Sequence, residues 1–349
     1  MNLNAYKKQA EPVVDVEAIT TLIADTQREN GEIPWNPGAK TDPWDHVEAA
    51  IGLSIGGRFK EARQAYRWLA DKQLMDGSWY SSYINGIPED RTRESNMSSY
   101  LAVGLFHYYL MTGDADFLET MWQPLCGGIA FALSLQTPNG EIYWAISPEE
   151  KIDEMALLTG ASSIFMSLKC ALHIAKILGR FKPDWQSALL KLGDAIRNKT
   201  HLFNITKSRF SMDWFYPILS GCITGGQAQK RIDAYWKKFV IRGQGVRCVS
   251  DEPWVTIAET SELSLALNAM GNIDLSRIVL NWICDRTFDD GSFWCGFTYP
   301  DIITWPEDKI TWSNAVVLMA ADAIYQMTPA SHLFSHHFWS TLPFLQLPT

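Results

Sequence analysis

Acidic residues stand at the start of several runs of small and apolar residues, and this placement is the feature most suggestive of chemistry. Asp45 and Glu48 open one such run, and Glu259 and Glu262 open another. Glu259 and Glu262 are three residues apart, which puts both carboxyl groups on the same face of a helix. Two carboxyl groups can act as general acid and general base when one is kept protonated and the other ionised. The sequence therefore predicts acid–base chemistry where these runs begin.

Aromatic residues accompany the acidic ones. Tryptophan faces suit the C–H bonds of a sugar ring, and they equally stabilise a carbocation. An arginine in the same region is suited to binding an anionic substrate group. The predicted catalytic residues are Asp45, Asp213, Glu259, Glu262 and Glu94. The predicted substrate-binding residues are Trp44, His46, Glu48, Trp214, Arg247, Trp254, Trp305, Glu307 and Trp312.

Structural roles are the alternative for several of these residues. Aspartate is a preferred helix N-cap, so Asp45 or Asp213 could simply cap its own helix. Glu262 could be a buried acid paired with Arg247. Glu94 follows two arginines and could form a salt bridge with one of them. His46 could be a hydrogen-bonded loop histidine rather than a general base.

The elements that would position these residues are two sets of helices. Polar clusters recur at intervals of roughly 50 residues, and each opens a segment that is apolar nearly all round, as in a buried helix. Amphipathic segments alternate with them, because apolar residues recur there at helical spacing. The polar clusters begin at Trp44, Glu94, Thr159, Ser211, Glu259 and Thr311. The amphipathic segments span about 14–28, 58–73, 115–136, 183–199, 228–241 and 273–287.

This alternation predicts an all-α fold, a single (α/α)6 toroid of six helical hairpins with an inner and an outer ring. The toroid is expected to be one domain over residues 1–349, with the tail 328–349 packed on it. Alternation of apolar and polar residues with a period of two is almost absent, so strands should be short and confined to loops. The inner helices would begin at one shared rim, where the candidate residues would meet.

Glycine-containing turns repeat after the amphipathic segments. Gln27 and Gly31, Gln73 and Gly77, and Gln136 and Gly140 have the same spacing, and Asp290-Gly291-Ser292-Phe293-Trp294 is a related turn. These turns resemble the QW repeats of terpenoid cyclases and protein prenyltransferases. The chain also resembles bacterial proteins labelled prenyltransferase-like, through Asp42-Pro43-Trp44-Asp45-His46-Val47-Glu48, Ser211-Met212-Asp213-Trp214 and Trp305-Pro306-Glu307. This resemblance implies isoprenoid chemistry in a toroid.

A second resemblance is to six-hairpin glycosidases of the glucoamylase type. It rests on Trp44-Asp45 before an inner helix and on the segment from Thr112 to Trp122. This resemblance implies a sugar substrate and two catalytic carboxyl groups. The Trp-Glu pair that supplies the acid in glucoamylases falls at Trp144-Ala145, so that glutamate is missing here. The Asp-x-Asp-Asp motif of terpene cyclases and a zinc site of Asp, Cys and His are also missing.

Composition excludes several other classes of function. The chain of 349 residues has a net charge of −9 and no basic patch, which argues against nucleic acid. No apolar run approaches the roughly 18 residues of a membrane helix, so no transmembrane segment is expected. The N-terminus has no apolar signal region, and the six scattered cysteines are expected to be reduced, which favours the cytoplasm. No cofactor and no metal are expected.

The favoured hypothesis is a carbohydrate-active enzyme, an inverting glycoside hydrolase with two carboxylates at the rim and a tryptophan-lined cleft. Its partner would be a small-molecule or oligosaccharide substrate. The alternative is an isoprenoid enzyme related to terpenoid cyclases and prenyltransferases, with an isoprenoid substrate and neither the Asp-rich motif nor the zinc site. A third possibility is a toroid that binds a glycan or lipid without catalysis.

Overall fold

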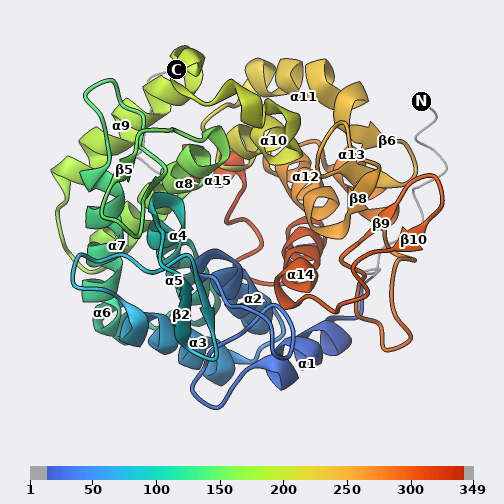
Figure 1. Ribbon diagram of the computed structural model, residues 1–349, viewed down its shortest axis with the longest axis horizontal. Coiled ribbons are helices and arrows are strands. Elements are labelled where there is room, and N and C mark those ends of the chain that lie inside the picture. Colours follow the sequence, from blue (N-terminus) through green and yellow to red (C-terminus); the bar gives the residue numbers. More distant parts are fainter. Residues whose placement is uncertain (1–13, 342–349) are drawn as a thin grey trace.

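Two concentric rings of helices make up the protein in a computed structural model that describes residues 14–341 (Figure 1). This arrangement confirms the all-α toroid. The inner helices are α2 (Pro43–Ile55), α4 (Ser95–Ser99) with α5 (Leu101–Thr112), α8 (Leu158–Ile177), α10 (Ser211–Leu219), α12 (Ile257–Ala269) and α14 (Thr311–Tyr325). The outer helices are α1 (Val16–Thr26), α3 (Phe59–Lys72), α6 (Ala115–Thr120) with α7 (Trp122–Ser134), α9 (Pro183–Asn198), α11 (Gly225–Phe239) and α13 (Ile273–Asn281).

The difference between the two rings follows from their residue patterns. In the outer helix α3 the buried residues are Ala62, Ala65, Tyr66, Trp68 and Leu69, which form one stripe. The inner helix α8 is buried along nearly all of its 20 residues. By length and composition α8 alone among the helices of residues 14–341 could cross a membrane, but 94% of its apolar window is buried inside the protein. It is therefore packed as the core helix of a toroid.

The first and last inner helices close the ring. Gly52 of α2 lies so near α14 that a Cβ atom added to it would be 2.8 Å from the Cβ of Ala315. At the start of α14, Thr311 donates its backbone N–H to the carbonyl of Trp35 and its hydroxyl to the carbonyl of Pro34, each at 2.8 Å. These contacts join parts of the chain that are far apart in sequence, so the ring has no free end.

The repeated glutamine turns connect neighbouring outer helices. The Gln73 amide donates to the carbonyl of Gly77 in its own turn at 2.9 Å and to the carbonyl of Pro124 in α7 at 2.8 Å. Gln27 and Gln136 make the corresponding pairs of bonds, to Gly31 and Glu61 and to Gly140 and Ala188. Gly77 has a φ of 89° and touches the backbone of Gly127, so a side chain has no room there. Each turn therefore joins one outer helix to the next by hydrogen bonds.

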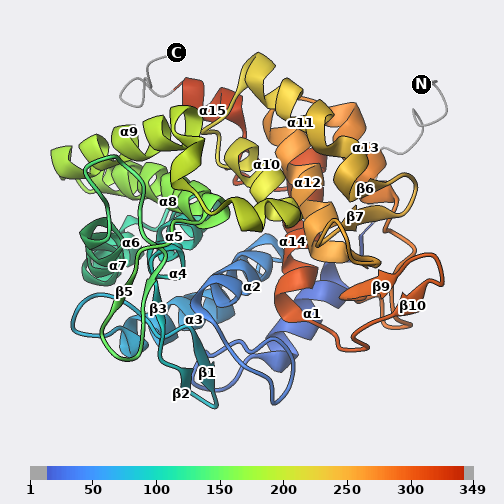
Figure 2. The same cartoon turned by 45° about the horizontal axis from the view of Figure 1, so that its top comes forward.

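Short antiparallel strands lie in the loops, as predicted (Figure 2). One pair is β1 (Ser82–Ile84) with β2 (Ile87–Asp90), and a three-stranded sheet contains β3 (Arg93–Glu94), β4 (Ala145–Ile146) and β5 (Ile152–Asp153). A five-stranded sheet has the order β10-β9-β8-β7-β6, with β6 (Val240–Ile241), β7 (Gly245–Arg247), β8 (Trp254–Thr256), β9 (Gly296–Thr298) and β10 (Ile303–Thr304). β8 leads directly into α12, so this sheet positions the start of that helix.

The last described helix packs against the inner ring. After α14 a turn leads to α15 (His336–Ser340), in which Trp339 is buried. Trp339 contacts the rings of Phe106 in α5 and His173 in α8, and the Lys169 ammonium lies 4.3 Å from its ring centroid. Residues 342–349 of the predicted tail lie outside the described part of the chain.

Candidate active site

An acidic cluster forms where α2 and α12 begin. Asp45 and Glu48 come from the first turns of α2, and Glu259 and Glu262 come from the first turns of α12. Glu48, Glu259 and Glu262 are 2%, 7% and 4% exposed, whereas Asp45 is half-buried. Electrostatic interactions connect Glu48 with both Glu259 and Glu262. The structure thus brings together four of the acidic residues that the sequence singled out.

Asp42 caps α2, which leaves the Asp45 carboxyl free of that role. The Asp42 carboxylate accepts the backbone N–H of Asp45 at 2.9 Å and the indole N–H of Trp35 at 2.8 Å. The alternative that Asp45 is the cap of its helix is therefore wrong. The sequence did indicate that Asp42 is the N-cap, because a proline such as Pro43 is common at the first helical position, directly after the cap.

Asp45 is the more accessible acid of the cluster and holds its proton strongly. Burial, and then the negative charges of Asp42 and Glu48, raise the pKa of Asp45 well above its usual range. Lys40 opposes this shift only in part. A half-buried carboxyl whose pKa is raised is suited to donate a proton to a substrate.

Two tyrosines and a tryptophan hold the buried glutamates. The Glu48 carboxyl accepts the indole N–H of Trp44 at 2.7 Å and the hydroxyl of Tyr100 at 3.2 Å. Burial nevertheless raises the pKa of Glu48 to about 8. Glu262 accepts the Tyr216 hydroxyl at 2.7 Å, and burial followed by the charge of Glu48 raises the pKa of Glu262 well above its usual range.

These contacts decide between the two interpretations of Glu262. Its partner is Tyr216, and no ion pair joins it to Arg247 among residues 14–341, so the structural pairing considered from sequence is wrong. Sequence reasoning missed Tyr100 and Tyr216 because they lie just before α5 and on α10, and nothing in their neighbours marks them. Trp44 stacks on Tyr100 with ring centroids 4.9 Å apart, so its face is partly covered.

Two thiols border Glu259. Burial, and then the neighbouring Glu259 carboxyl, raise the pKa of the Cys248 thiol above its usual range. Burial and then Glu259 also raise the pKa of Cys295 to about 12, with a smaller effect from Asp45. Cys295 is therefore near both Glu259 and Asp45. Both cysteines flank the strand β8, and no pattern in the sequence indicated that they would lie here.

Asp213 and Glu94 are held by other parts of the ring. The Asp213 carboxylate accepts the backbone N–H and the hydroxyl of Thr159 at 3.1 and 2.6 Å, so it caps the neighbouring helix α8 rather than its own. Glu94 accepts the indole N–H of Trp144 at 2.9 Å and the Ser81 hydroxyl at 3.0 Å. Burial raises the pKa of both carboxyls.

Glu94 lies next to Ala145, the position at which the resemblance to glucoamylases would put a glutamate. In the β3–β4 pair, Glu94 is directly opposite Ala145, so its carboxyl approaches the same region from the adjacent strand. The salt bridge considered for Glu94 is not formed with Arg93. Arg93 instead pairs with Asp76 and Glu150.

Two of the predicted substrate-binding residues lie in the core. His46 is buried, accepts the Ile33 backbone N–H at 3.1 Å through Nδ1, and has Nε2 2.9 Å from the Ala65 carbonyl. Trp214 is 2% exposed, stacks on Phe239 and donates to the Arg231 carbonyl. Both side chains have structural partners, and we leave them out of the proposed site.

Other predicted residues lie around the five-stranded sheet and the start of α14. Trp254 on β8 and Trp305 pack edge to face with centroids 5.3 Å apart, and Trp305 is 59% exposed. Arg247 on β7 and Trp312 on α14 are half-buried, and Glu307 is exposed. The Trp312 indole N–H is buried and has no hydrogen-bond partner among residues 14–341. Among these same residues, no three His, Cys, Asp or Glu side chains are grouped so as to hold a metal ion.

The geometry can supply acid–base chemistry, because the half-buried Asp45, whose pKa is raised, belongs to the same cluster as the carboxyl groups of α12. Comparison with known proteins bears on what that chemistry acts on. No family model matches the chain. Over 312 residues the chain is 44% identical to the "MMP endo-(1,4)-3-O-methyl-alpha-D-mannosidase" of Mycolicibacterium hassiacum, covering 89% of this chain and 86% of that enzyme.

Solved structures with the same architecture include several sugar-active enzymes. A glycosidase variant in complex with glucose superimposes with a TM-score of 0.68 at 15% identity, over 90% of this chain and 96% of that one. A GH63 mannosylglycerate hydrolase from Thermus thermophilus does so with a TM-score of 0.68 at 11% identity, over 89% and 100%. A D-mannose isomerase reaches 0.67 at 10% identity, over 93% and 97%. At these identities the likeness shows the toroid fold, and it gives no support to the prenyltransferase-like resemblance.

Proposed function

The chain belongs to the family of the MMP endo-(1,4)-3-O-methyl-α-D-mannosidase and is a glycoside hydrolase, and on that basis we propose that it cleaves internal α-(1,4) linkages of 3-O-methyl-mannose oligosaccharides with inversion. The substrate class is supported by the relative's name at 44% identity. The observation that carries the mechanism is the acidic cluster of α2 and α12, in which the more accessible carboxyl is Asp45, whose pKa is raised well above its usual range.

Asp45 is the proposed general acid. It donates its proton to the glycosidic oxygen as the bond from that oxygen to the anomeric carbon breaks. The raised pKa of Asp45 favours its protonated form, and Asp42, engaged by Trp35 and by the Asp45 backbone, holds the first turn of α2 in place.

Glu259 is the proposed general base. It removes a proton from a water molecule whose oxygen bonds to the anomeric carbon on the face opposite the leaving group. Glu48 and Glu262 are less suited to this role, because burial raises the pKa of both carboxyls, that of Glu48 to about 8, and so disfavours the ionised form that a base needs. An inverting enzyme needs a separation of ~6.5–9.5 Å between the two carboxyl groups to admit the water. Asp45 and Glu259 lie on two inner helices, α2 and α12, with α14 between them (Figure 1).

Aromatic residues beside the cluster are the proposed sugar contacts. Trp254 and Trp305 offer partly exposed faces for the C–H bonds of a pyranose or for its O-methyl group. Trp312 offers a buried N–H donor without a partner among residues 14–341. An extended set of contacts suits an enzyme that cleaves within a chain.

The anomer released first tests the stereochemistry. We expect ¹H NMR of the digest of an α-(1,4)-linked 3-O-methyl-mannose oligosaccharide to show the β-anomer at the new reducing end before mutarotation. Release of the α-anomer first would mean retention, and would exclude Glu259 as a base that acts through water.

Glycosyl fluorides separate the acid from the base, because fluoride leaves without protonation. Asp45→Asn should lose about 10²–10⁴-fold in kcat on the oligosaccharide but less than about tenfold on the corresponding α-fluoride. Glu259→Gln should lose activity on both substrates. Asp274→Asn, an exposed carboxyl on the outer helix α13, is the matched control and should keep both activities. If Glu262→Gln rather than Glu259→Gln abolishes fluoride hydrolysis, the base is Glu262.

A further inference from the structure

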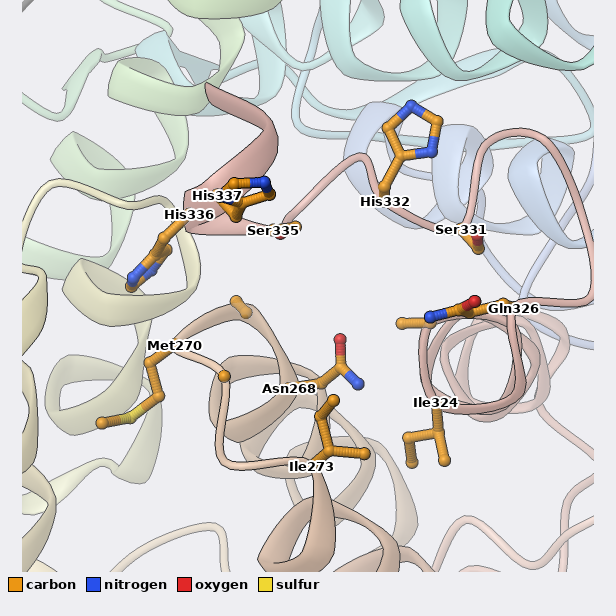
Figure 3. A pocket seen from close by; sticks show the side chains of 13 residues that line it. Asn268, Met270, Ile273, Ile324, Gln326, Ser331, His332, Ser335, His336 and His337 are labelled. Atoms are coloured by element: carbon orange, nitrogen blue, oxygen red, sulfur yellow. The ribbon is translucent and has the colours of Figure 1, made fainter. Parts of the chain in front are cut away.

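A cavity lies at the other end of the inner helices from the acidic cluster (Figure 3). Its volume is about 460 Å³, and it is bounded by the last turns of α12 and α14 and by the segment that leads to α15. Asn268 of α12 is nine residues beyond Glu259, which corresponds to roughly 14 Å along the helix axis. The cavity is therefore separate from the site that we assign to catalysis.

Polar side chains without partners line this cavity. The side chains of Asn268, Gln326, Ser331, His332 and His337 form no hydrogen bond or ion pair with any residue of 14–341. Figure 3 shows the side chains of Asn268, on α12, and of Gln326, the residue after α14, on the wall of this cavity. Side chains with free donors and acceptors that face one space are characteristic of a binding site for a polar molecule.

The lining also contains no Asp, Glu, Lys or Arg. Burial lowers the pKa of His332, and it lowers the pKa of His336 to about 4, so these rings are neutral at neutral pH. A neutral imidazole offers one donor and one acceptor, as an amide side chain also offers both. A charged ligand would lose its hydration here without gaining a counter-ion.

Apolar side chains complete the wall. Ile273 of α13, Ile324 of α14 and Met270 lie beside the amides. Hydroxyl groups that both donate and accept hydrogen bonds, next to C–H or O-methyl surface, match this combination of neutral polar and apolar contacts. The volume lies within the ~300–1,000 Å³ range of small-molecule sites.

We propose that this cavity is a second, non-catalytic binding site for one or two units of a neutral, partly O-methylated saccharide. The saccharide class rests on the proposed function, whereas the location and the neutrality of the ligand rest on the cavity itself. Such a site would retain a long substrate on the enzyme while another part of it is cleaved.

NMR signals of methyl groups in the cavity wall can detect binding there independently of binding at the acidic cluster. We would titrate isoleucine- and methionine-methyl-labelled protein with methyl 3-O-methyl-α-D-mannopyranoside and with the α-(1,4)-linked oligosaccharide. Saturable shifts are expected at Ile273, Ile324 and Met270. A glucuronic acid methyl glycoside should bind at least tenfold more weakly. Absence of saturable shifts at these methyls, or equal binding of the anionic sugar, would overturn the proposal.

Variants of the lining test the same point without touching the acidic cluster. Asn268→Leu with Gln326→Met should weaken saccharide binding at the Ile273 methyl at least tenfold and leave kcat on a short oligosaccharide within twofold. Gln227→Met, an exposed glutamine of α11, is the matched control. Unchanged binding in the double variant would contradict the assignment. Hydrolysis without binding at the cavity refutes this inference alone, and binding at the cavity without hydrolysis refutes the proposed function alone.

Discussion

At the scale of single residues, the acidic cluster carries more carboxyl groups than one acid–base pair requires. Glu48 is the clearest case, because it is 2% exposed and its pKa is raised to about 8 mainly by burial. The folded protein therefore binds this proton more tightly than the unfolded chain, in which the pKa is near 4.5. The stability that results is complete below pH 4.5 and is lost as the pH rises toward 8, at up to about 1.4 kcal/mol per pH unit.

Replacing Glu48 by glutamine should remove this pH dependence. In Glu48→Gln the amide oxygen can still accept from Trp44 and Tyr100, while the amide N–H groups add a cost that is the same at every pH. The fall in unfolding free energy between pH 5 and pH 8 should become smaller by about 1–3 kcal/mol. Urea unfolding of wild type and variant at several pH values measures this change in unfolding free energy. Glu29→Gln, at an exposed site, is the control, and an equal fall in wild type and Glu48→Gln would refute the raised pKa.

Single residues also show what sequence could and could not reveal. Asp45, Glu259 and Glu262 were identified because acidic residues at the start of apolar helices are conspicuous in a linear pattern. Tyr100 and Tyr216 were missed because their role arises from contacts across the ring, over separations of about 50 residues. Conversely, Trp214 lies in the sequence where a residue of the rim is expected, but its ring packs against α11. The tertiary arrangement decides this packing, and the sequence pattern does not reveal it.

At the scale of the elements, the repeated glutamine turns stabilise the outer ring by joining neighbouring helices. Gln73 bridges its own turn and the first residues of α7 with two hydrogen bonds. Gln73→Ala should lower the unfolding free energy by about 1–3 kcal/mol, because two partly buried carbonyls lose their donor. The turn lies on the outer ring, so kcat should stay within twofold.

Chemical denaturation and steady-state kinetics check this prediction, with Gln227→Ala on the exposed surface of α11 as control. The control should change stability by less than about 0.5 kcal/mol. A large loss of activity with no loss of stability in Gln73→Ala would instead assign the turn to the active site.

The helices themselves were predictable from periodicity, and the limits of that prediction have physical causes. The segment expected at 183–199 is α9 at Pro183–Asn198, because its apolar stripe is regular. The segment expected as one helix over 115–136 is divided at Met121 into α6 and α7. The position of the five-stranded sheet was not predicted, because strands of two or three residues are too short to show an alternation of apolar and polar residues.

At the scale of the whole molecule, the contacts between α2 and α14 make the ring continuous. A closed ring has no terminal repeat that can fray independently, so we propose that the toroid unfolds as one domain. Gly52 allows this closure because α14 passes too close for a side chain: a Cβ atom would meet the Cβ of Ala315 at 2.8 Å and the Cδ1 of Ile23 at 3.0 Å.

Gly52→Ala tests both the contact and the cooperativity. Alanine favours a helix over glycine by up to about 1 kcal/mol, but the added methyl group should force α2 and α14 apart and lower the unfolding free energy by about 1–3 kcal/mol overall. Gly226→Ala is the matched control, because it lies in the outer helix α11 and a Cβ atom there meets nothing within 4 Å. It should be neutral or stabilising, so the difference between the two variants isolates the closure of the ring.

Unfolding followed by far-UV circular dichroism and by tryptophan fluorescence should give coincident transitions in wild type and in Gly52→Ala, because tryptophans are distributed around the ring and report on every part of it. If the ring is one unit, strain at α2 and α14 lowers the midpoint of both signals equally. Two separated transitions in Gly52→Ala would mean that part of the toroid persists when the ring opens, and the single domain would then have to be replaced by two subdomains that meet at α2 and α14.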